Sequence, residues 1–136
     1  LDKFSNKNIF DENFFLFYEE TDLCLNVKSN GGNVFSSKDL IIDHYGEKGS
    51  FAILPDKKYS YLKLRNWHLM WSSFYYYKKN YSYNYAFKLL IGQLIKSFIK
   101  FIFFGLLLNK HNYTKHLFRF LGLTNSMLGK KSWFRV

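Results

Sequence analysis

Three acidic side chains within four residues are the sharpest chemical signal in this 136-residue sequence. Glu19, Glu20 and Asp22 directly follow an aromatic block that ends at Phe17 and Tyr18. Repulsion between like charges and an adjoining apolar wall both make a carboxylate hold a proton more firmly, which suits a general base. A carboxylate cluster can also bind a divalent cation. The competing interpretation is a solvated first helical turn, where the helix dipole favours acidic residues.

Acidic and basic residues are separated along the chain. Residues 1–56 hold all ten acids and five lysines, a net charge of −5, whereas residues 57–136 hold no acid and fifteen Lys or Arg residues, a net charge of +15. We therefore expect an acidic catalytic segment over 1–56 and a basic, surface-binding segment over 57–136. The single cysteine, Cys24, excludes an intrachain disulfide and a multi-cysteine zinc site.

Local patterns place the acidic run at the beginning of a helix. We expect that helix over residues 17–30, ended by the run Asn30-Gly31-Gly32, because glycine adopts the left-handed C-cap conformation without steric cost. Two short strands are expected to follow, at 33–36 and 40–44. Pro55 then marks a boundary in the chain.

The basic half predicts three helices, over about 59–77, 82–108 and 110–128, with Ser82 as an N-cap. The second of these carries lysines in a narrow stripe on an otherwise Leu-, Ile- and Phe-rich cylinder. Its longest uninterrupted apolar run has eight residues, at 101–108, whereas a membrane span needs about 20 mostly apolar residues. We expect this helix to lie in the membrane interface, with its lysines on water or lipid phosphates.

The run Phe10–Leu25 resembles the signature of family-2 glycosyltransferases of the rhamnosyltransferase-like kind. Those proteins typically read Phe-Asp-Glu, two aromatics, a short gap, an acidic pair, Asp-Leu-Cys, and a helix that ends in Gly. The matching residues here are Asp11-Glu12, Phe14-Phe15, Glu19-Glu20, Asp22-Leu23-Cys24 and Gly31-Gly32, followed by His44 and Arg65-Asn66. The resemblance covers about residues 9–68, and beyond them only the basic, amphipathic character agrees.

The resemblance implies an α/β fold, with residues 1–56 as the C-terminal part of a GT-A Rossmann-like domain, a helix plus a short strand pair. Residues 57–136 would be amphipathic, membrane-associating helices. The implied activity is inverting transfer of a sugar from a nucleotide sugar to a membrane-linked glycan or lipid acceptor, usually with Mg²⁺ or Mn²⁺. The implied location is peripheral, at the cytoplasmic face of the cell membrane and on its anionic surface.

The same resemblance implies roles for individual residues. The general base falls on Glu20, where the family usually has Asp; Asp22 is the alternative base, and Glu19 lies beside both. Glu is one methylene longer than Asp, which matters where catalytic geometry is tight. The remaining implied roles are substrate binding by Asp11, Glu12 and Arg65, and metal contact by His44. For Arg65 and His44 the competing interpretation is structural, a helix-pinning arginine and a strand-end histidine.

Some family features are missing from these 136 residues: they contain no Asp-x-Asp metal motif and no Gly-rich phosphate loop after a strand. We therefore expect no sugar transfer by this chain alone. One alternative is a non-catalytic membrane-associated interaction protein, or a remnant of such an enzyme. A nucleic-acid-binding module is disfavoured, because the apolar residues after Ala86 are too contiguous and the acidic half would repel phosphates.

Overall fold

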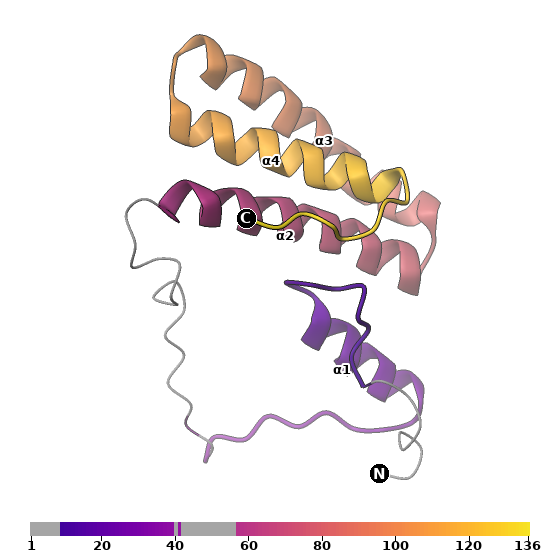
Figure 1. Cartoon of the computed structure of the whole chain (residues 1–136). Coiled ribbons are helices and arrows are strands. Elements are labelled where there is room, and N and C mark those ends of the chain that lie inside the picture. Colours follow the sequence, from indigo (N-terminus) through magenta and orange to yellow (C-terminus); the bar gives the residue numbers. More distant parts are fainter. Residues whose placement is uncertain (1–8, 40, 42–56) are drawn as a thin grey trace.

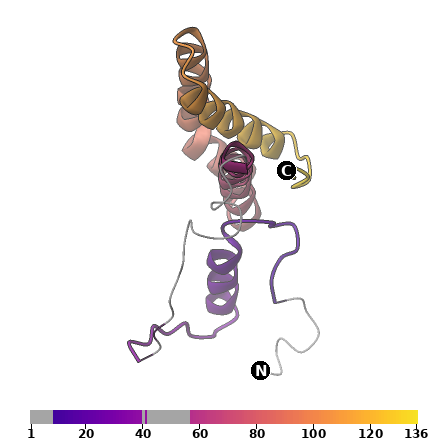
Figure 2. The ribbon, with the colours of Figure 1, turned by 60° about the vertical axis from the view of Figure 1, so that its left-hand side comes forward.

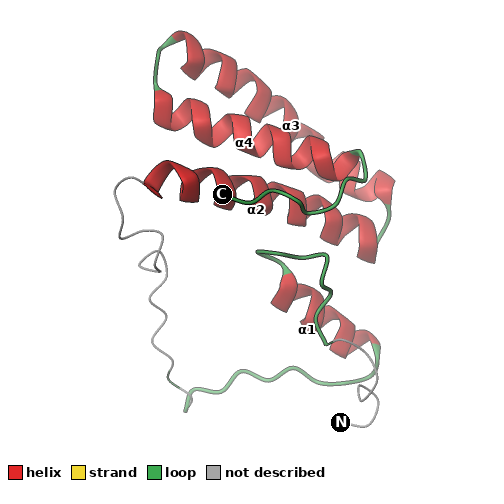
Figure 3. Ribbon diagram, in the orientation of Figure 1, coloured by secondary structure: helices red, strands yellow, loops and turns green. Residues whose placement is uncertain are grey.

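The computed structural model of this chain describes residues 9–39, 41 and 57–136. These residues form four helices: α1 (Glu19–Ser29), α2 (Lys58–Asn80), α3 (Tyr83–Leu106) and α4 (Lys110–Met127). Helix accounts for 69% of the described part, which contains no strand (Figure 3).

Helix α2 lies at the centre of the arrangement (Figure 1). The hairpin of α3 and α4 packs on one side of it, and α2 and α4 run side by side in the same direction. Helix α1 lies on the other side, and the C-terminal tail, residues 128–136, runs back along α2. Figure 2 shows from a second direction that α1 and the α3–α4 hairpin lie on opposite sides of α2.

Short polar residues begin two of the helices. The Ser82 hydroxyl accepts a hydrogen bond from the Tyr85 N–H at the start of α3, and the Asn109 side chain accepts one from the Asn112 N–H at the start of α4. Each satisfies a backbone donor that would otherwise have no partner in its helix. After α1, Gly31 takes the left-handed backbone conformation, at φ 78°, as the sequence predicts.

The core is small and forms where α2, α3 and α4 meet. Met70 and Phe74 of α2 pack against Ala86 and Leu90 of α3 and Leu123 of α4. Close approach of α2 and α4 depends on a glycine. A β-carbon at Gly122 would meet the Trp67 carbonyl group, with the carbonyl carbon only 2.9 Å away.

The C-terminal tail is fixed along α2 by hydrogen bonds. His68 is fully buried; its Nε2 lies 2.9 Å from the Phe134 carbonyl oxygen. The Trp71 indole donates to the Lys130 carbonyl at 2.9 Å. Burial is the main cause that lowers the pKa of His68, so the neutral ring is favoured at this anchor.

The structure contradicts the expected α/β class, because the regular elements of the described residues are four helices and no strand. Residues 33–36, expected as a strand, have no regular secondary structure, and of residues 40–44 only Ile41 is described. An alternating or apolar run becomes a strand only where a neighbour pairs with its backbone groups, and no such neighbour lies within the described part. The helices expected in the basic half and over residues 17–30 are confirmed to within a few residues.

Helix α3 leaves most of its apolar surface uncovered. Among the described helices it is the one long and apolar enough to cross a membrane. Its most apolar 18-residue stretch has a mean hydropathy of 1.8, and only 11% of that stretch is buried. Its exposed apolar side chains are Phe87, Leu89, Ile95, Phe98, Ile99, Ile102, Phe103 and Leu106. Lys88 and Lys96 are exposed on the same helix.

Candidate functional site

The chain enters α1 through a strained, well-anchored turn. Phe17 and Tyr18 have φ values of 68° and 71°, a left-handed conformation that costs non-glycine residues about 1–3 kcal/mol each. Two serines of α2 hold the turn: Ser72 donates to the Leu16 carbonyl oxygen and Ser73 to the Tyr18 hydroxyl, each at 2.8 Å. The acidic first turn of α1 is therefore positioned by α2 rather than by a local cap.

The two glutamates that follow this turn differ in exposure. Glu20 is exposed, whereas Glu19 is half-buried and its Oε2 is shielded from solvent without a hydrogen-bond partner in the described part of the chain. Both lie in the first turn of α1, where the positive end of the helix dipole stabilises a carboxylate. Glu20 is thus the carboxylate of this pair that an external hydroxyl group can reach.

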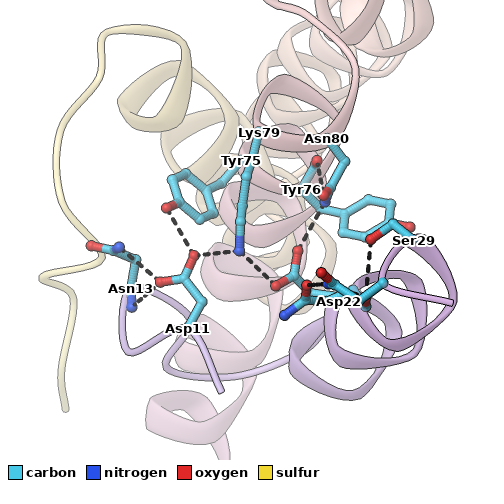
Figure 4. A network of polar contacts seen from close by, with 10 residues as sticks. Asp11, Asn13, Asp22, Ser29, Tyr75, Tyr76, Lys79 and Asn80 are labelled. Atoms are coloured by element: carbon cyan, nitrogen blue, oxygen red, sulfur yellow. Dashed lines mark hydrogen bonds and ion pairs between the residues drawn. The ribbon is translucent and has the colours of Figure 1, made fainter. Parts of the chain in front are cut away.

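Asp22 has a structural role (Figure 4). Its side chain is only 7% exposed and forms an ion pair with Lys79 of α2, with 2.6 Å between Oδ2 and Nζ. The Asn80 amide donates to its other oxygen at 2.8 Å. Both carboxylate oxygens are therefore engaged, and Asp22 joins α1 to the end of α2.

Asp11 meets the same lysine from the other side (Figure 4). Lys79 Nζ lies 2.8 Å from Asp11 Oδ2, and the Tyr75 hydroxyl donates to that oxygen at 3.1 Å. Asn13 donates to Oδ1 through its backbone N–H and its side chain. Burial alone would raise the pKa of Asp11, but the hydrogen bonds from Lys79 and Asn13 outweigh it and lower that pKa.

Lys79 bridges the two aspartates as a permanent cation. Burial opposes its charge, but the hydrogen bonds to Asp11 and Asp22 outweigh burial and raise its pKa. The ammonium group occupies the space between these carboxylates where a divalent cation would sit. Among the described residues, no group of three His, Cys, Asp or Glu side chains is placed to hold a metal, and the Mg²⁺ or Mn²⁺ that the resemblance implies stays a prediction. His44, the expected metal contact, lies outside the described residues.

An open pocket of about 540 Å³ borders the network. Phe10, Asp11, Glu12 and Asn13 line one side of it, and Lys131 and Ser132 of the tail line the other. The pocket brings together two residues that the sequence assigned to substrate binding, Asp11 and Glu12. Its volume and polar lining suit a sugar-sized ligand.

Arg65 and Asn66, adjacent in sequence, have different surroundings. The Asn66 side chain is buried, donates to the Leu62 carbonyl oxygen and accepts from Arg119 Nε of α4 at 2.8 Å. Both residues line a second pocket, between α2 and α4. The asparagine in addition joins the two helices through its hydrogen bond with Arg119.

Sequence reasoning did not assign this second pocket. Its lining residues are Lys58, Tyr61, Leu62, Arg65, Asn66, Leu69, His111, Lys115 and Arg119. The spacing of three basic residues indicates one wall of the pocket: His111, Lys115 and Arg119 follow each other at intervals of four and therefore share one face of a helix. Which helix that face would meet was not readable from the spacing.

Comparisons with protein-family models, with curated proteins and with solved structures give no match for this chain. The family resemblance therefore rests on the residues of the sequence itself, and the activity that it implies is a proposal.

Proposed function

We propose that this chain contributes the acceptor-facing part of a nucleotide-sugar-dependent, inverting glycosyltransferase at the cytoplasmic membrane surface, with Glu20 as the general base. The observation that carries the proposal is the contrast between two neighbouring acids. Glu20 is exposed on the anchored first turn of α1, while Asp22 is buried and bound by Lys79 and Asn80. The sequence left both acids as candidates for the general base, and this contrast in exposure favours Glu20.

In the proposed reaction, the Glu20 carboxylate takes the proton of an acceptor hydroxyl group. The hydroxyl oxygen then attacks the anomeric carbon of the donor, and the bond from that carbon to the phosphate oxygen breaks. The nucleoside diphosphate leaves with the bonding electrons, and the configuration inverts. Asp11 and Glu12, the proposed substrate-binding residues, line a pocket together with Lys131 and Ser132. Glu20 is not among its lining residues, so an acceptor held there would have to extend from the pocket to Glu20.

Membrane association is part of the proposal, because the acceptor would be linked to lipid. The exposed apolar face of α3 offers several large side chains to a lipid interface. Lys88 and Lys96 on the same helix are exposed, and each basic residue near an anionic surface contributes about 1 kcal/mol.

Substitution of Glu20 tests the catalytic assignment. In the full-length product of the coding sequence, Glu20→Gln should lower transfer from a radiolabelled nucleotide sugar to lipid extract by about a hundredfold or more, because it removes the base. Glu20→Asp, the residue usual in the family, should stay within about tenfold of the parent. Asp39→Asn, which changes an exposed acid elsewhere, is the matched control. Full activity of Glu20→Gln would refute the assignment.

The alternative function is a non-catalytic, membrane-associated interaction protein. One observation favours it: Asp11 and Asp22 are both committed to holding α1 and the N-terminal segment on α2. Under this alternative the full-length protein binds anionic vesicles but turns over none of a panel of nucleotide sugars.

A further inference from the structure

The pocket between α2 and α4 has the composition of an anion site. Its volume is about 620 Å³. Four cationic side chains line it, Lys58 and Arg65 from α2 and Lys115 and Arg119 from α4, together with His111, and none of the acids within residues 9–39 is among its lining residues. All ten acids of the sequence lie in residues 1–56.

The backbone adds to this positive charge. Lys58 is the first residue of α2 and His111 the second of α4, so both helices present their N-terminal ends to this pocket. Figure 1 shows the two helices side by side in the same direction. Neither first turn contains an acid. Unpaired N–H groups and the helix dipole make such ends favourable for phosphate oxygens.

The arginines are gathered here against their mutual repulsion. Asn66 accepts from Nε of Arg119 and thereby orients its guanidinium group at the pocket wall. Burial, and secondly the charge of Arg65, lower the pKa of Arg119. An arrangement that concentrates like charges in this way is stabilised when an anion enters.

We propose that this pocket binds the diphosphate group of a phosphorylated ligand. Arg119 can offer a bidentate pair of donors to phosphate oxygens, and the other cationic side chains of the pocket add positive charge. Leu62, Leu69 and Tyr61 provide an apolar wall for the rest of the ligand. Because α1 packs on the other end of α2, at Ser72–Asn80, the site is separate from Glu20. It does not depend on the proposed transfer reaction, and either can fail while the other holds.

Calorimetric titration of the 136-residue chain with inorganic pyrophosphate tests the site. The double variant Lys58→Gln/Lys115→Gln should weaken pyrophosphate binding by about tenfold or more, because two charge-assisted contacts are lost. Lys28→Gln/Lys78→Gln removes the same charge from exposed positions outside the pocket and should bind as the parent does. Far-UV circular dichroism of each variant checks that the helices persist. Arg119→Lys keeps the positive charge but loses the paired N–H donors of the guanidinium group, and it should also weaken binding if the pocket is the site.

Two results would overturn the proposal. One is the absence of measurable pyrophosphate binding to the parent chain. The other is equal weakening in the pocket variant and the charge-matched control, which would mean diffuse attraction by the net charge. Vesicles of phosphatidylcholine with phosphatidylglycerol identify the source of the phosphate. Competition between vesicles and pyrophosphate supports a lipid headgroup, and additive binding supports a soluble diphosphate.

Discussion

Two acids separated by one residue, Glu20 and Asp22, have different surroundings in this protein. Successive residues of a helix are rotated by about 100°, so Glu20 and Asp22 point about 200° apart around α1. One therefore faces solvent and the other faces α2, where Lys79 and Asn80 bind it. The sequence showed the acidic cluster but not this division, because the partner lysine lies 57 residues further along the chain.

His116 carries a prediction about pH. The ring is 7% exposed, its Nδ1 has no partner in the described part, and Phe104 stacks on it. Burial is the main cause that lowers its pKa to about 4, followed by nearby positive charges. Those charges belong to Lys96 and Lys100 on α3 and to Lys115 and Arg119 on α4.

The pKa of His116 is lower in the folded than in the unfolded chain. Its contribution to the free energy of unfolding is therefore fully present above about pH 6.5 and is lost as the pH falls toward 4. Between pH 7 and pH 5 the unfolded chain takes up a proton that the folded ring refuses, a loss of about 2 kcal/mol. In urea unfolding followed by tryptophan fluorescence, His116→Phe should lose about 2 kcal/mol less than the parent over this interval. His111→Gln, an exposed histidine, should match the parent. Identical pH dependence of His116→Phe and the parent would contradict this account.

At the level of elements, the helices were predictable and the strand pair was not. Helices follow from the spacing of apolar residues and from capping residues, such as Ser82 before α3 and Gly31 after α1. Both act within a few residues, so the sequence alone shows them. A strand depends on a partner that supplies its backbone hydrogen bonds. Residues 33–36 have the composition expected of a strand but no partner in the described part of the chain.

The contact between α2 and α4 provides a second prediction. Gly122→Ala should destabilise the chain by about 2–3 kcal/mol, because the added methyl group would meet the Trp67 carbonyl and force the helices apart. Gly92→Ala is the matched control, since its β-carbon would meet nothing within 4 Å. It should stabilise α3 by up to about 1 kcal/mol. Urea unfolding of the two variants measures both effects, and equal stability of Gly122→Ala and the parent would show that the helices can separate without loss.

At the scale of the whole molecule, charge and apolar surface coincide in the same half of the chain. Residues 57–136 carry a net charge of +15, and α3 exposes large apolar side chains at both ends, at Phe87 and Leu89 and from Ile95 to Leu106. Twenty-four residues span about 36 Å as a helix, enough to cross a hydrocarbon layer of about 30 Å. Lys88, Lys96 and Lys100 would then lie at membrane depth, which is costly, whereas an interfacial position leaves them at the headgroups.

An interfacial α3 predicts salt-sensitive binding to vesicles that contain phosphatidylglycerol, because screening weakens attraction between the lysines and the anionic surface. Ile95→Gln/Ile99→Gln should lower the partition coefficient onto vesicles, measured by sedimentation, by about tenfold or more. The reason is that two exposed apolar side chains no longer enter the lipid. Phe35→Gln removes an exposed aromatic side chain outside α3 and should bind as the parent does. If the parent stays with the vesicles in high salt and alkaline carbonate, α3 crosses the bilayer. The lysines would then need partners inside it, since uncompensated charges at that depth are not tolerated.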